Sequence, residues 1–260
     1  MADPPASPGV QWHIRRFTEI DSTNRYVLDA ARAGAPPGLV VVADHQHAGR
    51  GRRGRAWTAP PGSSLLVSVL LGPPPEPDHA QVLAMAAGLA LAAAVRAVAG
   101  FDAELKWPND LVVGDRKLAG LLAETDARGG RVRSVVVGIG CNVTWVGFPP
   151  ELAETATACD REAGHAVDRG ALLDALLDAL AAELAALDAV PARYRSRLGT
   201  LGQEVRVELA TGTLEGAAVD VDEHGRLAVQ PPTGPPVLVG AGDVIHLRRV
   251  TDPGPRPPAP

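Results

Sequence analysis

The residues with the clearest chemical potential are four arginines in a glycine-rich stretch at 49–57 (GRGRRGRAW). Guanidinium groups pair well with carboxylate or phosphate oxygens, and Trp57 offers a flat face on which an aromatic base can stack. Because its three glycines make the backbone entropically costly to order, we expect a mobile loop that orders around an anionic ligand. The composition favours a nucleotide; a solvated basic turn and a nucleic-acid-binding patch are the alternatives.

A second chemical signal is the scarcity of lysine. Lysine and arginine together number 25, yet only Lys106 and Lys117 are lysines. An ammonium group is a compact charge on a flexible stem, and a broad planar guanidinium cannot replace it in a narrow site. We therefore predict that both lysines belong to one tight site, with chance as the alternative.

Composition limits the classes of protein that remain. The chain has 260 residues, 46% hydrophobic and 21% charged, which indicates a globular protein with one sizeable domain and a small one. Its net charge of −5 makes the arginine loop a local cationic island and argues against a general nucleic-acid-binding surface. Two cysteines, Cys141 and Cys159, are too few for a disulfide framework and favour a reducing compartment, the cytoplasm.

Neither a secretory nor a membrane-spanning segment is predicted. The N-terminus has no apolar signal core, and Gly88 and Arg96 interrupt the alanine-rich run at 84–98. Residues 1–10 and 251–260 are rich in proline and are expected to be disordered.

In the first part of the chain, strands are predicted at 12–17, 39–43 and 63–71, and helices at about 22–33 and 78–99. Asp21 or Ser22 is expected to cap the first helix, and the Ser22 and Thr23 hydroxyls are either capping groups or groups presented to a ligand. Gln46 lies just after the second strand, and its amide can both donate to and accept from a cyclic urea or amide. The histidines on either side of Gln46 favour ordinary polar packing over a metal site, because no third ligand is near in the sequence.

The middle of the chain predicts a hairpin and a further buried strand. The hairpin has strands at 103–113 and 116–124 and brings the two lysines together. Pro108 interrupts it where Lys106, Asn109 and Asp110 would point out of the sheet. The next strand, at 132–138, ends in the segment 138–142 (GIGCN), whose glycines permit close approach of a ligand ring.

The remainder changes from helical to strand periodicity. Residues 149–198 are predicted to be helical scaffold, and short strands at 204–209, 213–221, 227–230, 236–239 and 243–247 predict a small β-barrel. We therefore expect a catalytic domain at 11–200 and a barrel domain at 201–250.

Five motifs in this order resemble the biotin–protein ligase family over residues 12–248: 21–24 (DSTN), Gln46 with the arginine loop, 106–110 (KWPND), 116–120 (RKLAG) and 138–142 (GIGCN). Joint occurrence of these motifs is highly specific. The resemblance implies an α+β fold with a mixed-sheet catalytic domain related to class II aminoacyl-tRNA synthetases, followed by an SH3-like barrel. It also implies a reaction in which ATP and Mg²⁺ activate biotin as biotinyl-AMP, which then biotinylates a lysine on the carrier domain of a carboxylase.

The resemblance implies roles for particular residues. Arg52, Lys106 and Lys117 would be catalytic. The biotin-binding residues would be Ser22, Thr23, Asn24, Gln46, Arg50, Gly51, Arg52 and Lys117. The adenylate would contact Arg52, Arg55, Trp57, Lys106, Asn109 and Asn142. Asp110 would orient a lysine or the magnesium ion.

Two features depart from the family pattern. About a dozen residues precede the first strand, so no DNA-binding unit and no repressor role are expected. Cys141 stands where an aliphatic residue is expected, and a small buried thiol packs in a similar way. A lipoate or octanoate ligase of the same fold and a non-catalytic nucleotide-binding module are the competing functions. We expect a monomer or a weak homodimer.

Overall fold

The computed structural model describes residues 10–72, 80–128, 131–209, 212–240 and 243–248. The two segments predicted to be disordered, apart from residue 10, lie outside these residues, and so does the proline-rich segment 73–77, for which the sequence predicts a bend.

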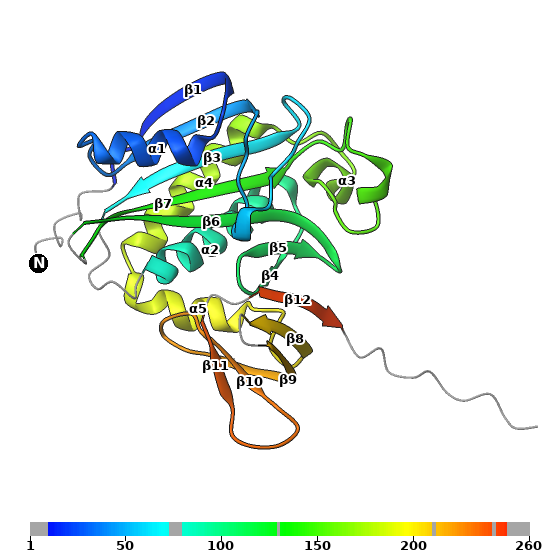
Figure 1. Cartoon of the computed structure of the whole chain (residues 1–260). Helices are drawn as coiled ribbons and strands as arrows, with labels where there is room; N and C mark the ends of the chain where they lie inside the picture. Colours follow the sequence, from blue (N-terminus) through cyan, green and yellow to red (C-terminus); the bar gives the residue numbers. More distant parts are fainter. Residues whose placement is uncertain (1–9, 73–79, 129–130, 210–211, 241–242, 249–260) are drawn as a thin grey trace, which may run out of the picture.

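The core of the fold is a seven-stranded mixed sheet with the order β1-β2-β3-β7-β6-β5-β4 (Figure 1). Strands β1 and β2 are parallel, and the other neighbours are antiparallel. The strands are β1 (His13–Ile20), β2 (Leu39–Gln46), β3 (Ser64–Leu71), β4 (Glu104–Lys106), β5 (Asp110–Val113), β6 (Arg116–Arg128) and β7 (Arg131–Asn142). The predicted mixed-sheet α+β fold is confirmed.

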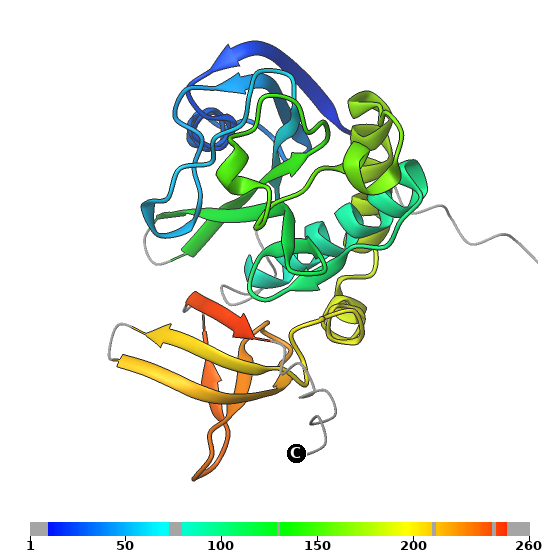
Figure 2. The ribbon, with the colours of Figure 1, turned by 90° about the vertical axis from the view of Figure 1, so that its right-hand side faces the viewer.

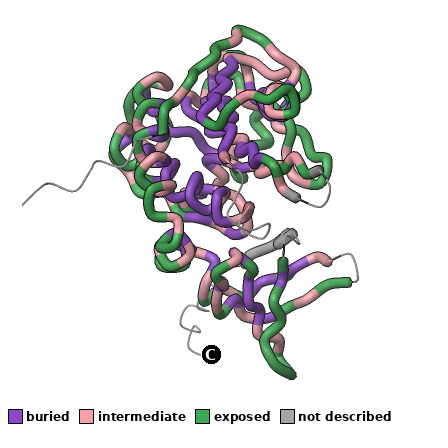
Figure 3. Tube along the Cα trace, turned by 90° about the vertical axis from the view of Figure 1, so that its left-hand side faces the viewer, coloured by how far each residue is buried: buried purple, intermediate pink, exposed green. Residues whose placement is uncertain are grey.

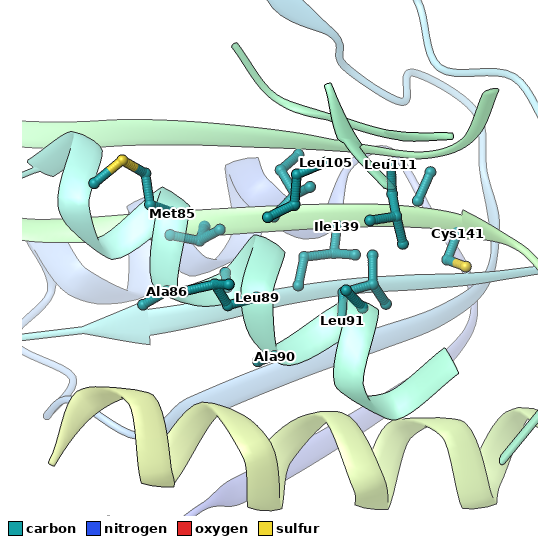
Figure 4. Close-up of a cluster of buried hydrophobic side chains, with 14 of the residues drawn as sticks. Met85, Ala86, Leu89, Ala90, Leu91, Leu105, Leu111, Ile139 and Cys141 are labelled. Atoms are coloured by element: carbon teal, nitrogen blue, oxygen red, sulfur yellow. The ribbon is translucent and has the colours of Figure 1, made fainter. Parts of the chain in front are cut away.

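Side-chain alternation along the central strands divides the protein into layers. On β2, Val40 joins the large core cluster on one face and Val41 joins a smaller cluster on the other. Helix α1 (Thr23–Arg32) covers the smaller cluster. Helices α2 (Ala80–Ala99) and α4 (Arg169–Leu184) cover the large one, to which Met85 and Leu91 of α2 and Ile139 of β7 belong (Figures 1 and 4).

Helix α2 is long and apolar enough to cross a membrane by length and composition alone. Within the fold, however, 72% of its most apolar window is buried. It packs against α4 and against β6 and β7 of the sheet. Figure 3 shows that buried residues gather in the interior, with exposed residues around them. This is the environment of a core helix, which needs an apolar surface on all sides.

The structure corrects the predicted hairpin. Residues 103–113 do not form one interrupted strand, because the chain reverses at Trp107–Asn109 and β4 pairs antiparallel with β5. Lys106 thus stands directly opposite Asp110. Pro108 cannot donate a ladder hydrogen bond, which favours a turn at this point. Strand β7 also extends further than predicted, through the GIGCN segment to Asn142.

The C-terminal part contains short helices and a second sheet. The helices are η3 (Pro150–Leu152), α3 (Cys159–Ala163), η4 (Leu187–Ala189) and α5 (Val190–Ser196). The sheet is antiparallel with the order β11-β10-β9-β8-β12 and lies beside α5, below the main body in Figure 2. Its strands are β8 (Glu204–Leu209), β9 (Gly212–Val221), β10 (Leu227–Gln230), β11 (Val237–Val239) and β12 (Asp243–Arg248). The five predicted strands are confirmed, whereas closure into an SH3-like barrel stays a prediction.

The packing between α2 and the sheet predicts the effect of one substitution. Leu91 is 0% exposed, so Leu91→Ala should lower the free energy of unfolding by about 2–5 kcal/mol, measured by urea denaturation. Val146→Ala is the control because Val146 is 68% exposed and should change stability little. An equal effect of the two substitutions would contradict this description of the core.

Candidate functional site

A cavity of about 260 Å³ lies on the α1 face of the mixed sheet. Its walls come from the start of α1, the end of β2, the arginine loop, the β4–β5 turn, β6 and β7. The predicted site residues that line it are Ser22, Thr23, Asn24, Gln46, Arg50, Gly51, Arg52, Arg55, Trp57, Lys106, Asn109, Asp110 and Lys117. Both lysines and the arginine loop therefore share one cavity, as predicted.

One end of the cavity is formed by hydroxyl and amide groups. Of the two capping residues expected from the sequence, Ser22 is the one that caps α1, by accepting a hydrogen bond from the backbone N–H of Arg25. The Gln46 carbonyl oxygen accepts from the backbone N–H of Thr23 at 2.8 Å and from its hydroxyl at 3.0 Å. These bonds join the end of β2 to the start of α1 and fix the orientation of the Gln46 amide.

Polar side chains beneath this end link α1 to the arginine loop. The Ser68 hydroxyl lies 2.7 Å from Thr23 Oγ1 and 2.5 Å from Asn24 Oδ1. Asn24 Nδ2 donates to Glu124 Oε2 at 2.9 Å, and Arg50 Nη2 pairs with Glu124 Oε1 at 2.9 Å. Sequence reasoning missed Ser68 and Glu124. The available signals were a serine inside an apolar strand and a carboxylate near the edge of the predicted hairpin.

Two glycines of β7 make room for side chains of the protein itself. A Cβ atom on Gly138 would lie 2.1 Å from Asn24 Oδ1, and one on Gly140 would lie 2.4 Å from Trp57 Cε2. The sequence predicted that these glycines admit a ligand ring. The structure instead places Asn24 and the Trp57 indole against them.

The other end of the cavity is charged. Lys117 Nζ lies 2.7 Å from Asp110 Oδ1 and 5.5 Å from the centroid of the Trp57 ring. Arg52 Nη1 donates to Asn109 Oδ1 at 3.3 Å, and Asn109 Nδ2 donates to the carbonyl of Leu121 at 2.6 Å. The β4–β5 turn and the start of β6 therefore orient the basic groups of this end.

The cavity lining carries a strong excess of positive charge. The cationic residues are Arg50, Arg52, Arg55, Lys106 and Lys117, and Asp110 is the one carboxylate in the lining. Burial raises the pKa of Tyr194 on the adjacent α5, and the nearby Asp110 carboxylate adds to the rise while Arg52 opposes it. On a chain of net charge −5, this cluster is suited to holding an anion.

Asn142 is the one predicted site residue outside the cavity lining. Its side chain is buried, donates to the carbonyl of Thr157 at 3.0 Å and accepts from the Ser64 hydroxyl at 3.4 Å. Its role in adenylate binding stays a prediction.

The two histidines that flank Gln46 and the two cysteines occupy structural positions. His47 pairs with Glu19 at 3.1 Å, and its ring packs edge-to-face on His45 at 4.9 Å. Over the described ranges, no group of three His, Cys, Asp or Glu residues could hold a metal ion. Cys141 and Cys159 are buried with sulfurs 4.0 Å apart, and the Cys159 thiol together with burial raises the pKa of Cys141.

Comparison with known proteins agrees with this geometry. The model of the biotin/lipoate A/B protein ligase family matches residues 17–142, and that of the biotin protein ligase C-terminal domain matches residues 200–247. A biotin–[acetyl-CoA-carboxylase] ligase from Mycobacterium tuberculosis is 40% identical over 237 residues, which cover 87% of this chain and 86% of that protein. The protein of the same name from Paracoccus denitrificans is 35% identical, with 85% and 95% covered.

A solved structure gives the same result. Biotin protein ligase from Aquifex aeolicus in complex with biotin and ATP superposes with a TM-score of 0.77 at 28% identity, covering 91% of this chain and 98% of that chain. From the order of the motifs, their convergence on one cavity and these similarities, we conclude that the chain belongs to the biotin protein ligase family.

Proposed function

We propose that this protein is an ATP-dependent ligase that forms biotinyl-AMP and transfers biotin to a lysine of a biotin carboxyl carrier domain of a carboxylase. The observation that carries the proposal is the convergence of Lys106, Lys117 and Arg52 on the cavity that also holds Thr23 and Gln46. A hydrogen-bonding end and a cationic end suit a ligand with a polar ring and a carboxylate. A lipoate ligase would not require the hydrogen-bonding end.

The polar end is assigned to the biotin ring. Ser22, Thr23, Asn24 and Gln46 surround it, and the fixed Gln46 amide presents its nitrogen beside Gly49. Cyclic ureas both donate and accept hydrogen bonds, so hydroxyl and amide groups are suitable partners.

The cationic end is assigned to the reacting groups. In the first step the biotin carboxylate attacks the α-phosphorus of ATP, the acyl–phosphate bond forms and pyrophosphate leaves. Negative charge gathers on the phosphate oxygens, where Lys117, Lys106 and Arg52 would stabilise it; a single fixed donor is worth about 3 kcal/mol. In the second step the carrier lysine attacks the acyl carbon and AMP leaves, with Arg55 and Trp57 holding the adenylate.

Magnesium is a proposal that rests on the donor set. Mg²⁺ in ATP sites is commonly held by one or two carboxylates together with the phosphates, and Asp110 supplies one carboxylate in the lining. The ion would neutralise phosphate charge when bound. The 2.7 Å pair between Asp110 and Lys117 favours orientation of the lysine as the role of this carboxylate.

Other properties are proposed from the same reasoning. The acidic net charge supports the expectation of no DNA binding, and the two free cysteines support a cytoplasmic location. We further propose kinship of the mixed sheet with class II aminoacyl-tRNA synthetases, an SH3-like form for the second sheet, and a monomer or weak homodimer.

The proposed function is tested by ATP–pyrophosphate exchange. Exchange should depend on biotin, and lipoate or octanoate should not replace it. Exchange with lipoate alone would establish the alternative ligase, and no exchange with either acid would support a non-catalytic nucleotide-binding module.

Lys117 supplies a substitution test. The space around its ammonium is narrow, because a Cβ on Gly120 would lie 3.1 Å from Lys117 Nζ. We expect Lys117→Arg to lower the rate of exchange on the order of 100-fold although the charge is kept. The matched control is Arg116→Lys, because Arg116 pairs with Glu162 at 2.8 Å and does not line the cavity. Near-normal exchange by Lys117→Arg would refute the requirement for an ammonium group.

The arginine loop supplies a test of ligand closure. Its backbone pairs Arg50 with Ala56, and a Trp57 N–H bond to the Gly49 carbonyl at 2.9 Å closes its base. A mixed anhydride hydrolyses in open water, so residues 45–57 should close over biotinyl-AMP. Hydrogen exchange of these amides should slow when biotinyl-AMP is added, while amides of β9 stay unchanged. Equal exchange rates with and without the intermediate would contradict closure.

A further inference from the structure

Trp107 lies at the reversal between β4 and β5, between Lys106 and Pro108. It is 2% exposed, although it lines the cavity together with its neighbours in the turn. Its indole Nε1 donates to the carbonyl of Gly225 at 2.8 Å, and its backbone N–H donates to the Thr200 hydroxyl at 2.9 Å. Both hydrogen bonds of Trp107 therefore reach residues far along the chain.

Both partners belong to the C-terminal part of the fold. Gly225 lies in the turn between β9 and β10, and Thr200 lies in the segment that leads into β8. The same segment covers the outer edge of β4, because Leu198 bridges Leu105 and the Gly199 N–H donates to the Leu105 carbonyl at 2.9 Å. The C-terminal part thus contacts the β4–β5 turn at its edge and at its tip.

The turn that holds the indole is itself fixed. Asp222 Oδ1 accepts from the backbone N–H of His224 at 3.0 Å and of Arg226 at 2.8 Å, and Arg226 Nε pairs with Asp222 Oδ2 at 2.7 Å. Burial acts to raise the pKa of Asp222, but the Arg226 and His224 hydrogen bonds outweigh it and hold the pKa below its usual value. The Gly225 carbonyl is therefore presented at a defined place.

Gly225 cannot easily be replaced at this place. Its φ of +76° is in the left-handed region, and a Cβ would lie 2.7 Å from Gln81 Cγ and 3.0 Å from Met85 Sδ of α2. The turn is thus confined between the start of α2 and the Trp107 indole.

We infer that Trp107 is a positioning residue through which the C-terminal sheet sets the position of Lys106 and Asn109 at the cationic end of the cavity. This rests on the function proposed above. Phenylalanine would fill most of the same buried space, so what tryptophan adds is a donor. Without it, the buried Gly225 carbonyl loses its partner and the turn loses its fixed register with the sheet.

The inference predicts that the two ends of the cavity respond differently. Ser22, Thr23 and Gln46 are held by bonds between α1 and β2, remote from the C-terminal sheet in Figure 1. Loss of the Trp107 bond should therefore affect ATP and leave biotin binding unchanged.

The experiment compares Trp107→Phe with the wild type in ATP–pyrophosphate exchange. We expect kcat/KM for ATP to fall on the order of tenfold, as for the loss of one buried hydrogen bond. The dissociation constant for biotin alone, measured calorimetrically, should stay within about twofold. Trp12→Phe is the matched control, because Trp12 packs only partly buried at the start of the chain, and it should change neither quantity.

A second pair of variants tests the same point without changing the ring. Thr200→Val removes the acceptor for the Trp107 N–H with little change in volume, and Thr200→Ser keeps the hydroxyl. The valine variant should show the ATP-specific loss, and the serine variant should restore it.

Three outcomes separate the possibilities. Unchanged ATP parameters in folded Trp107→Phe or Thr200→Val would overturn the inference. A parallel loss of biotin affinity, ATP parameters and thermal stability would also overturn it, since that is the result of a purely structural role. Absence of biotin-dependent exchange in the wild type would instead overturn the proposed function.

Discussion

Mutual repulsion among cations held around one small cavity is the constraint that the rest of the site must meet. Five basic side chains line about 260 Å³, and like charges this close disfavour one another unless carboxylates lie between them. Asp110 and Glu124 supply that compensation at opposite ends through their pairs with Lys117 and Arg50. These two pairs offset part of the repulsion among the basic groups, and the Asp110 pair orients Lys117 within the fold itself, so less reorganisation of that lysine accompanies the chemistry.

The alternation of side chains between the two faces of the sheet provides the space for the site. Ser68, Gly138 and Leu122 are in register across β3, β7 and β6, and so are Gly140 and Gly120 across β7 and β6. Alternate residues on these strands face the α2 layer and form the large core. On the cavity face, the glycines leave room for the side chains of Asn24 and Trp57. On the opposite face, larger apolar side chains pack against the helices. The arrangement explains why glycines interrupt otherwise apolar strands.

Sequence reasoning located the elements and most of the site because its signals were local. Residue type and spacing indicated the helix start at residues 21–22, the buried strand that leads to Gln46, and the shared site of the two lysines. The features that the sequence did not predict correctly depend on interactions between residues that are distant in the sequence. The single strand predicted at 103–113 was wrong because the antiparallel pairing of Lys106 with Asp110 is not visible in the periodicity of the residues. The predicted turn between residues 113 and 116 is confirmed. The Ser68–Asn24–Glu124 connection joins three elements and leaves no pattern in any one of them.

Sequence patterns are local, so they predicted the strands of the second sheet but could not show that this sheet contacts the β4–β5 turn at the cavity. Residues 107 and 225 are far apart in the sequence, and nothing in either motif identifies the other. In the structure the Trp107 indole needs an acceptor because it is buried, and the Gly225 carbonyl meets that need from a turn that only glycine fits. A buried polar atom in a functional motif thus identifies the distant segment on which that motif depends. By this argument the KWPND turn and the C-terminal sheet act as one unit, and the position of Lys106 and Asn109 is a property of both.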